Sequence, residues 1–187
     1  MIRSFIAIEL PHEVKELIFQ AQSRLKGAGA GVKWVNVRAM HLTLKFLGNV
    51  ADNLPEKIAH SFSGQFSLTA PLNLQVAGTG FFPNERRPRV VWVGLRGDLE
   101  PLGRAWQQLD QGLAAFDFEP ETRPFNPHVT LGRVKDNLNL DLLVKRVRAL
   151  ADFSTPAFLV NKMYVFQSDL KPTGAVYTKL AEIRLNY

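Results

Sequence analysis

The sequence predicts an α+β fold of two lobes that are related by an internal duplication. Two stretches repeat the same order of elements: an apolar strand, an amphipathic helix and a strand with a His-x-Thr pattern. The two histidines, His41 and His128, are 87 residues apart, and the arginines before the apolar strands, Arg3 and Arg89, are 86 apart. We expect one bilobal domain over residues 1–187, with repeat halves of roughly 1–80 and 85–187. Each lobe should have a mostly antiparallel sheet and two helices, and a central cleft should receive one His-x-Thr pattern from each lobe.

The first copy begins with an apolar segment, Arg3 to Leu10, that predicts a buried strand. Pro11 suits the first turn of a helix, and the residues after it place apolar side chains on one helical face: Val14, Leu17, Ile18, Ala21 and Leu25. Glycines at 27, 29 and 31 end this helix. Residues 40–47 then alternate, so we expect a half-buried strand with His41, Thr43 and Lys45 on one face and Leu42, Leu44 and Phe46 on the other.

The second copy repeats this order from Arg89. Residues 90–95 predict an apolar strand, and the helix after it has one apolar stripe: Leu102, Trp106, Leu109, Leu113 and Phe116. His128 to Arg133 is the second His-x-Thr strand. Each such strand precedes a predicted helix (54–62 and 140–151) and an alternating strand (72–76, and from 158 onward). We expect residues 81–88 to form a connecting loop and residues 78–80 (Gly-Thr-Gly) to form a turn.

The composition narrows the classes of partner and compartment. A net charge of +6 and a sequence pI near 9.8 favour an anionic ligand such as nucleic acid or phosphate. The chain has no cysteine, which excludes a disulfide framework, a thiolate nucleophile and a cysteine metal site, and suits a reducing compartment. The first residues do not form a signal peptide, and the sequence contains no membrane-spanning stretch. We therefore expect a cytoplasmic protein without a membrane partner.

The paired histidines predict acid and base chemistry at one phosphate. Residues two apart in a strand share a face, so His41 lies beside Thr43 and His128 beside Thr130. If the strands meet across a cleft, one imidazole can accept a proton from the nucleophile and the other can donate one to the leaving oxygen. The threonine hydroxyls can donate to phosphate oxygens. Arg133 is the candidate for binding the negative charge, although strict alternation turns it to the other face unless the strand bends at Gly132.

Other patterns have simpler interpretations. His12 and His60 are expected on helix surfaces. Trp34, Phe81 and Phe82 are expected in ordinary core packing, with base stacking as the alternative. Arg86, Arg87 and Arg89 fit either a solvated loop or an RNA path. A catalytic zinc site usually needs three protein ligands, and the sequence has no His-Glu-x-x-His pattern, so we expect no metal.

The chain resembles the 2H phosphoesterase superfamily, which is defined by paired His-x-Thr motifs. Within it, the chain is similar to the bacterial and archaeal RNA 2′,3′-cyclic phosphodiesterases, formerly named 2′-5′ RNA ligases. The resemblance covers nearly the whole chain and rests on five segments: Arg3 to Pro11, His41 to Gly48, Arg89 to Gly94, Arg123 to Arg133 and Ser168 to Tyr177.

The resemblance implies that water opens a terminal 2′,3′-cyclic phosphate of RNA and leaves a 2′-phosphomonoester, with no cofactor and no metal. By position, His41 would be the proton donor to the leaving oxygen and His128 the acceptor from water, while Thr43, Thr130 and Arg133 would bind phosphate. The expected partner is RNA with a cyclic phosphate end, bound by a monomer. Two alternatives stay open: RNA ligation by the reverse reaction, and an RNA-binding module whose histidines only contact phosphate.

Overall fold

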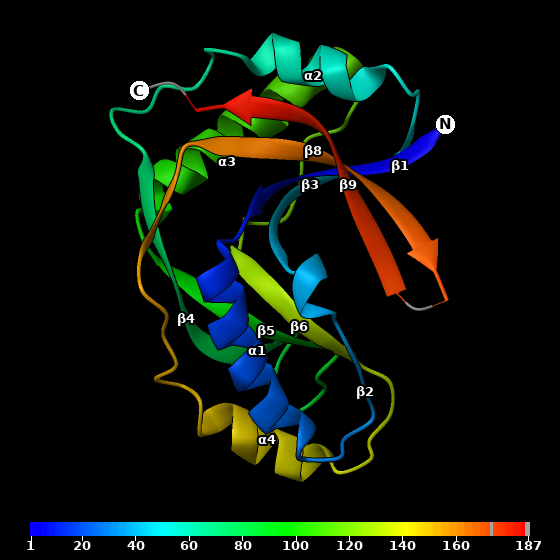
Figure 1. The fold of residues 1–187 in the computed structure, drawn as a ribbon, viewed down its shortest axis with the longest axis vertical. Helices are drawn as coiled ribbons and strands as arrows, with labels where there is room; N and C mark the ends of the chain where they lie inside the picture. Colours follow the sequence, from blue (N-terminus) through cyan, green and yellow to red (C-terminus); the bar gives the residue numbers. More distant parts are fainter. Residues whose placement is uncertain (173, 186–187) are drawn as a thin grey trace.

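The computed structural model describes residues 1–172 and 174–185, and it consists of two lobes (Figure 1). Each lobe has an antiparallel sheet. The first sheet has the order β3-β1-β8-β9 and contains β1 (Ile2–Glu9), β3 (His41–Val50), β8 (Lys162–Lys171) and β9 (Gly174–Arg184). The second has the order β2-β6-β5-β4-β7 and contains β2 (Val32–Trp34), β4 (Leu72–Phe82), β5 (Val90–Gly97), β6 (His128–Val134) and β7 (Phe158–Val160). The predicted α+β class and antiparallel pairing are confirmed.

The helices are divided evenly between the two lobes. The first sheet is covered by α2 (Leu54–Phe62) and α3 (Leu99–Gly112), and the second by α1 (His12–Lys26) and α4 (Leu140–Arg148) (Figure 1). Two short 3₁₀ helices, η1 (Val37–Ala39) and η2 (Leu113–Phe116), complete the order of elements. None of the helices in the described ranges is both long and apolar enough to span a bilayer.

The lobes do not coincide with the two halves of the sequence. Helix α1 comes from the first half but packs on the second sheet, where the Gln22 amide donates to the carbonyl of Leu131 in β6 at 2.9 Å. Helix α3 comes from the second half but packs on the first sheet, where the Trp106 indole donates to the carbonyl of Leu44 in β3 at 3.0 Å. Each half of the chain therefore builds part of both lobes.

One continuous core joins the lobes. Helices α1 and α3 bury residues of the apolar stripes predicted for them: Val14, Ile18, Ala21 and Leu25 in α1, and Leu102 and Leu109 in α3. Burying each leucine or isoleucine contributes roughly 1.5–3 kcal/mol. The same cluster includes Leu42 of β3 and Val129 of β6. Because the two His-x-Thr strands anchor in one core, packing fixes their relative position.

Three elements differ from the predictions. Gly78, expected in a turn, lies inside β4 at a register shift between Ala77 and Thr79. Its φ of +72° is a conformation that glycine adopts without strain, so the glycine marks a β-bulge. The connecting loop is shorter than expected, because Phe81 and Phe82 still belong to β4. Helix α4 ends at Arg148 rather than at Ala151. Thr173, in the last segment of the resemblance, lies outside the described residues.

Candidate active site

Both catalytic candidates are oriented by the same local hydrogen bond. His41 is the first residue of β3, and its Nδ1 lies 2.8 Å from the carbonyl oxygen of Ala39. His128 is the first residue of β6, and its Nδ1 lies 2.7 Å from the carbonyl oxygen of Asn126. A carbonyl only accepts, so each Nδ1 carries the hydrogen and donates. In the neutral rings Nε2 is then the free basic nitrogen, and each histidine offers it to a ligand.

A β-bulge follows the threonine in both strands. In the pairing of β1 with β3, Ala7 faces Thr43 and Ile6 faces Lys45, which leaves Leu44 unpaired. In the pairing of β5 with β6, Trp92 faces Thr130 and Val91 faces Gly132, so Leu131 is skipped. An extra residue reverses the alternation of side chains beyond it. The residue five positions after each histidine therefore returns to the face of the histidine and threonine.

These bulges correct the predicted faces of three residues. Arg133 shares the face of His128 and Thr130, because the extra residue at Leu131 does what a bend at Gly132 was expected to do. The prediction for Lys45 is wrong: it points into the protein and is only 6% exposed. Phe46, expected among the buried residues, is 64% exposed on the face of His41.

Each bulge carbonyl accepts a hydrogen bond from a helix side chain. The indole Nε1 of Trp106 donates to Leu44 in β3 at 3.0 Å, and the amide of Gln22 donates to Leu131 in β6 at 2.9 Å. Gln22 also donates to the carbonyl of Val35 at 2.8 Å, and its side chain is fully buried. These bonds satisfy carbonyls at sites where the strand ladder is irregular, so they stabilise both bulges.

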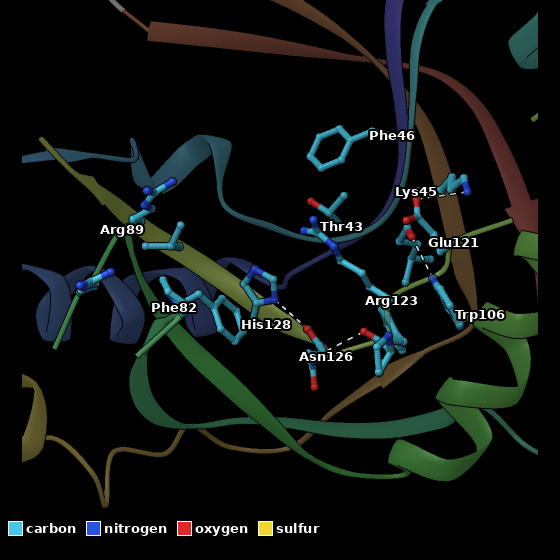
Figure 2. A pocket seen from close by; sticks show the side chains of 16 residues that line it. Thr43, Lys45, Phe46, Phe82, Arg89, Trp106, Glu121, Arg123, Asn126 and His128 are labelled. Atoms are coloured by element: carbon cyan, nitrogen blue, oxygen red, sulfur yellow. Dashed lines mark hydrogen bonds and ion pairs between the residues drawn. The ribbon is translucent and has the colours of Figure 1, made fainter. Parts of the chain in front are cut away.

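The bulged faces open into two adjoining cavities. One, of about 300 Å³, contains His41 and is called here the His41 chamber; its polar lining comprises Arg3, Ser4, Thr43, Thr130, Arg133, Ser168 and Tyr177. The other, of about 800 Å³, contains His128 and is called the His128 chamber (Figure 2). Thr43 and Phe46 line both chambers and form their shared wall. The fold thus brings all five predicted site residues to two cavities that share Thr43 and Phe46 in their lining.

The two histidines have different surroundings. His41 stacks on Phe5, with ring centroids 4.6 Å apart, and meets Tyr177 edge-on at 5.1 Å. Burial lowers the pKa of His41 to about 4, against the raising effect of its bond to the Ala39 carbonyl, and the charge of Lys15 lowers it further. His41 is therefore neutral near pH 7 when no anion is bound. His128 is flanked by the edge-on ring of Phe82 at 4.8 Å.

Sequence reasoning missed several residues of the His41 chamber. Arg3 and Tyr177 line it, and burial raises the pKa of the Tyr177 phenol while the charges of Arg3 and Arg133 oppose that shift. The two arginines therefore lie near this hydroxyl. The Oγ of Ser4, buried at the same chamber, has no hydrogen-bond partner among the described residues. Arg3 and Tyr177 occur within the segments of the family resemblance, which was the available signal.

The Lys45 side chain fastens the segment before β6 to the first lobe. Its Nζ lies 2.7 Å from Asp110 and 3.2 Å from Glu121, and it donates to the carbonyl of Glu119 at 2.8 Å. Burial alone would lower the pKa of Lys45, but its hydrogen bonds to the two carboxylates outweigh this and raise it. Removing one partner from such a buried pair costs about 3–5 kcal/mol. The cluster therefore holds residues 119–121, and the chain leading to His128, against β3.

No cluster of three histidine or acidic side chains suited to a metal ion occurs within residues 1–172 and 174–185. Ser, Thr, Arg, Tyr and His side chains dominate the polar lining of the His41 chamber. Such groups donate hydrogen bonds to a phosphate and, through the histidines, exchange protons with it.

Comparison with known proteins identifies the family to which the chain belongs. A family model described as LigT like Phosphoesterase matches residues 8–92 and, a second time, residues 94–177. The chain therefore belongs to this phosphoesterase family, within the 2H superfamily, and the two matches correspond to the duplicated halves.

Relatives and solved structures align over nearly the full chain. A protein of Methanothermobacter thermautotrophicus named RNA 2′,3′-cyclic phosphodiesterase is 32% identical over 98% of this chain and 99% of its own. One of the same name from Thermotoga maritima is 33% identical over 97% and 94%. The crystal structure of TT0787 of Thermus thermophilus superposes with a TM-score of 0.74 at 30% identity, covering 98% of this chain and 97% of that one. Escherichia coli LigT complexed with 3′-AMP gives 0.75 at 25% identity, covering 100% and 99%.

Proposed function

We propose that this protein hydrolyses the terminal 2′,3′-cyclic phosphate of RNA to a 2′-phosphomonoester, with His41 and His128 as the acid and base pair. The observation that supports this most is the placement of two imidazoles, each with a free Nε2, in chambers that share the wall of Thr43 and Phe46. The relatives named RNA 2′,3′-cyclic phosphodiesterase supply the substrate class.

In the proposed reaction, Nε2 of His128 takes a proton from water as its oxygen attacks phosphorus. The bond from phosphorus to the 3′ oxygen breaks on the opposite side, and protonated His41 donates its Nε2 proton to that oxygen. The hydroxyls of Thr43 and Thr130 donate to non-bridging phosphate oxygens, and the Arg133 guanidinium balances the negative charge. The phosphate stays on the 2′ oxygen. His128 gains one proton and His41 loses one, so the pair together carries the same number of protons before and after the reaction.

The lowered pKa of His41 fits its donor role once the substrate is bound. In the free protein His41 is neutral near pH 7 because burial disfavours its charged form. A cyclic phosphate carries a negative charge, and an anion beside the ring favours the imidazolium. We propose that His41 takes up a proton together with the substrate and passes it to the leaving oxygen.

The test is an assay of an oligonucleotide with a 2′,3′-cyclic phosphate end, in buffer with EDTA. Wild type should form a 2′-phosphate end, and His41→Ala and His128→Ala should each lower the rate by about 10²–10⁴. His60→Ala, an exposed histidine of α2, is the matched control and should keep full activity.

Three results of this assay would count against the proposal. A 3′-phosphate product would contradict the assignment of the 3′ oxygen as the leaving group. Full activity of either histidine variant would contradict the two-histidine mechanism. Joining to an added 5′-hydroxyl RNA in preference to hydrolysis would favour the ligase. We further propose a cytoplasmic monomer, consistent with a chain without cysteine.

A further inference from the structure

The His128 chamber is larger than a terminal cyclic phosphate requires. It measures about 800 Å³, which lies within the range of sites that hold ligands of nucleotide size. It extends from His128 and the shared wall to the segment before β6, which contributes Arg123, Pro124, Phe125 and Asn126. The proton transfers involve only the part next to His128, so the rest of this cavity is open to other parts of the RNA.

A preformed aromatic stack forms one end of the chamber. The rings of Trp106 and Phe125 lie 4.8 Å apart and are parallel within 5°. Trp106 is fixed by its bond to Leu44, and the segment containing Phe125 follows residues held by Lys45. Every nucleobase has an aromatic face, so a rigid stack of this kind binds a base of any identity.

The charges in the chamber favour a phosphate. Arg87, Arg89 and Arg123 all line it. In the ranges 1–172 and 174–185 none of the three forms an ion pair with a carboxylate. The acidic residue in the lining, Glu121, is paired with Lys45 at 3.2 Å. Figure 2 shows the Arg123 side chain extending across the cavity toward Thr43, the wall shared with the His41 chamber.

We propose that the His128 chamber binds the nucleotide on the 5′ side of the reactive end, with its phosphate at Arg123 and its base on Phe125. This inference rests on the proposed function, because it places the reactive phosphate at the shared wall. The nucleotide before a cyclic end is joined to it through the 5′ phosphate. Arg123 lines the same chamber as Thr43, and the aromatic ring of Phe125 follows two residues later, which fits that order of phosphate and base. The enzyme then prefers the ends of oligonucleotides as substrates and binds cyclic mononucleotides less tightly.

The test compares three substrates that grow by one recognition group at a time: 2′,3′-cyclic AMP, its 5′-phosphorylated form, and the dinucleotide ApA ending in a 2′,3′-cyclic phosphate. For wild type, kcat/KM should rise at each step and be about tenfold or more higher for the dinucleotide than for cyclic AMP. Arg123→Ala should reduce the gain from the 5′ phosphate, and Arg123→Lys should restore part of it. Phe125→Leu should reduce only the gain from the added nucleoside.

Arg96→Ala at the end of β5 removes a surface cation outside both chambers and should leave the three kcat/KM values in their wild-type ratio. Equal kcat/KM for the three substrates in wild type would overturn the inference, as would an equal loss on all three in Arg123→Ala.

Turnover of none of the substrates would instead overturn the proposed function. Calorimetric binding of ApA 2′-phosphate and of 2′-AMP would then still test the chamber. Tighter binding of the dinucleotide by about tenfold supports it, and equal affinity rejects it.

Discussion

The two His-x-Thr strands share a frame but differ in what they present. Both begin with a histidine held by the carbonyl two residues before it, and both have a bulge after the threonine with a carbonyl bonded by a helix side chain. Five residues after the histidine, however, β3 presents Phe46 and β6 presents Arg133. The duplication thus supplies a symmetric scaffold, on which Arg133 adds a charge to the His41 chamber and Phe46 adds an aromatic ring to the shared wall.

The position one residue earlier differs as well. Lys45 in β3 is buried and ion-paired, whereas its counterpart in β6 is Gly132. A β-carbon on Gly132 would lie 2.6 Å from a methyl of Val32 and 2.9 Å from the ring of Trp34. The second lobe therefore has no space for a side chain at Gly132. In the first lobe, the Lys45 side chain at the equivalent position holds the segment that leads to His128.

The largest expected difference in activity is between the alanine variants of the two positions five residues after the histidines, Arg133 in β6 and Phe46 in β3. Arg133→Ala should lower kcat/KM by about 10²–10³, because it removes a charged donor to the phosphate in the transition state. Phe46→Ala should lower it by about tenfold, mainly through KM, because an exposed ring contributes stacking rather than charge. Steady-state kinetics on a cyclic-ended oligonucleotide measures both. Equal losses would mean that the two strands contribute alike, against the asymmetry argued here.

The pH dependence of stability distinguishes the buried histidine from exposed ones. The pKa of His41 falls from 6.5 to about 4 on folding, so between these values the unfolded chain binds more protons. The stability that depends on neutral His41 is fully present above pH 6.5. It is lost as the pH falls toward 4, and the unfolding free energy then decreases by about 3 kcal/mol. His41→Gln should flatten this slope in urea titrations from pH 7.5 to 4.5.

The exposed His60 provides the control for this measurement. His60→Gln replaces a surface histidine of α2 and should keep the wild-type slope. The same slope in wild type and His41→Gln would show that His41 titrates no differently in the folded protein, against the effect of burial argued here.

The smallest effect is expected at the helix side chains that bond the bulges. Gln22→Leu removes two hydrogen bonds to backbone carbonyls, and Trp106→Phe removes one, so each should lower the unfolding free energy by about 1–3 kcal/mol. Gln22→Leu should also lower kcat more than it raises KM, because the Leu131 bulge orients Arg133. Gln22→Glu, which keeps the length of the side chain, is the second variant for the same measurements. Wild-type kcat in Gln22→Leu would show that the bulge holds without its bond.

The sequence predicted what depends on periodicity and repetition. The spacing of Val14, Ile18 and Leu25 predicted helix α1 and its buried face, and the matched positions of His41 and His128 predicted two equivalent strands that each begin with a histidine. Both follow from patterns that a regular element imposes along the chain.

What the sequence did not predict depends on departures from regularity and on contacts between distant segments. Strict alternation placed Lys45 beside His41, because a single inserted residue leaves no composition signal in a strand. The exchange of α1 and α3 between the lobes, and the placement of Arg123 and Thr43 in one chamber, arise only from tertiary packing. Helix α4 ended early, since helix ends are weakly determined by apolar spacing.

The most direct test of the two-histidine account is a crystal structure of the protein with uridine and vanadate, which together mimic a five-coordinate phosphorus. The account predicts that Nε2 of His41 and Nε2 of His128 each lie about 3 Å from an apical oxygen of the same vanadium, on opposite sides. A complex in which only one ring contacts the vanadate, or in which both meet the same oxygen, would contradict it.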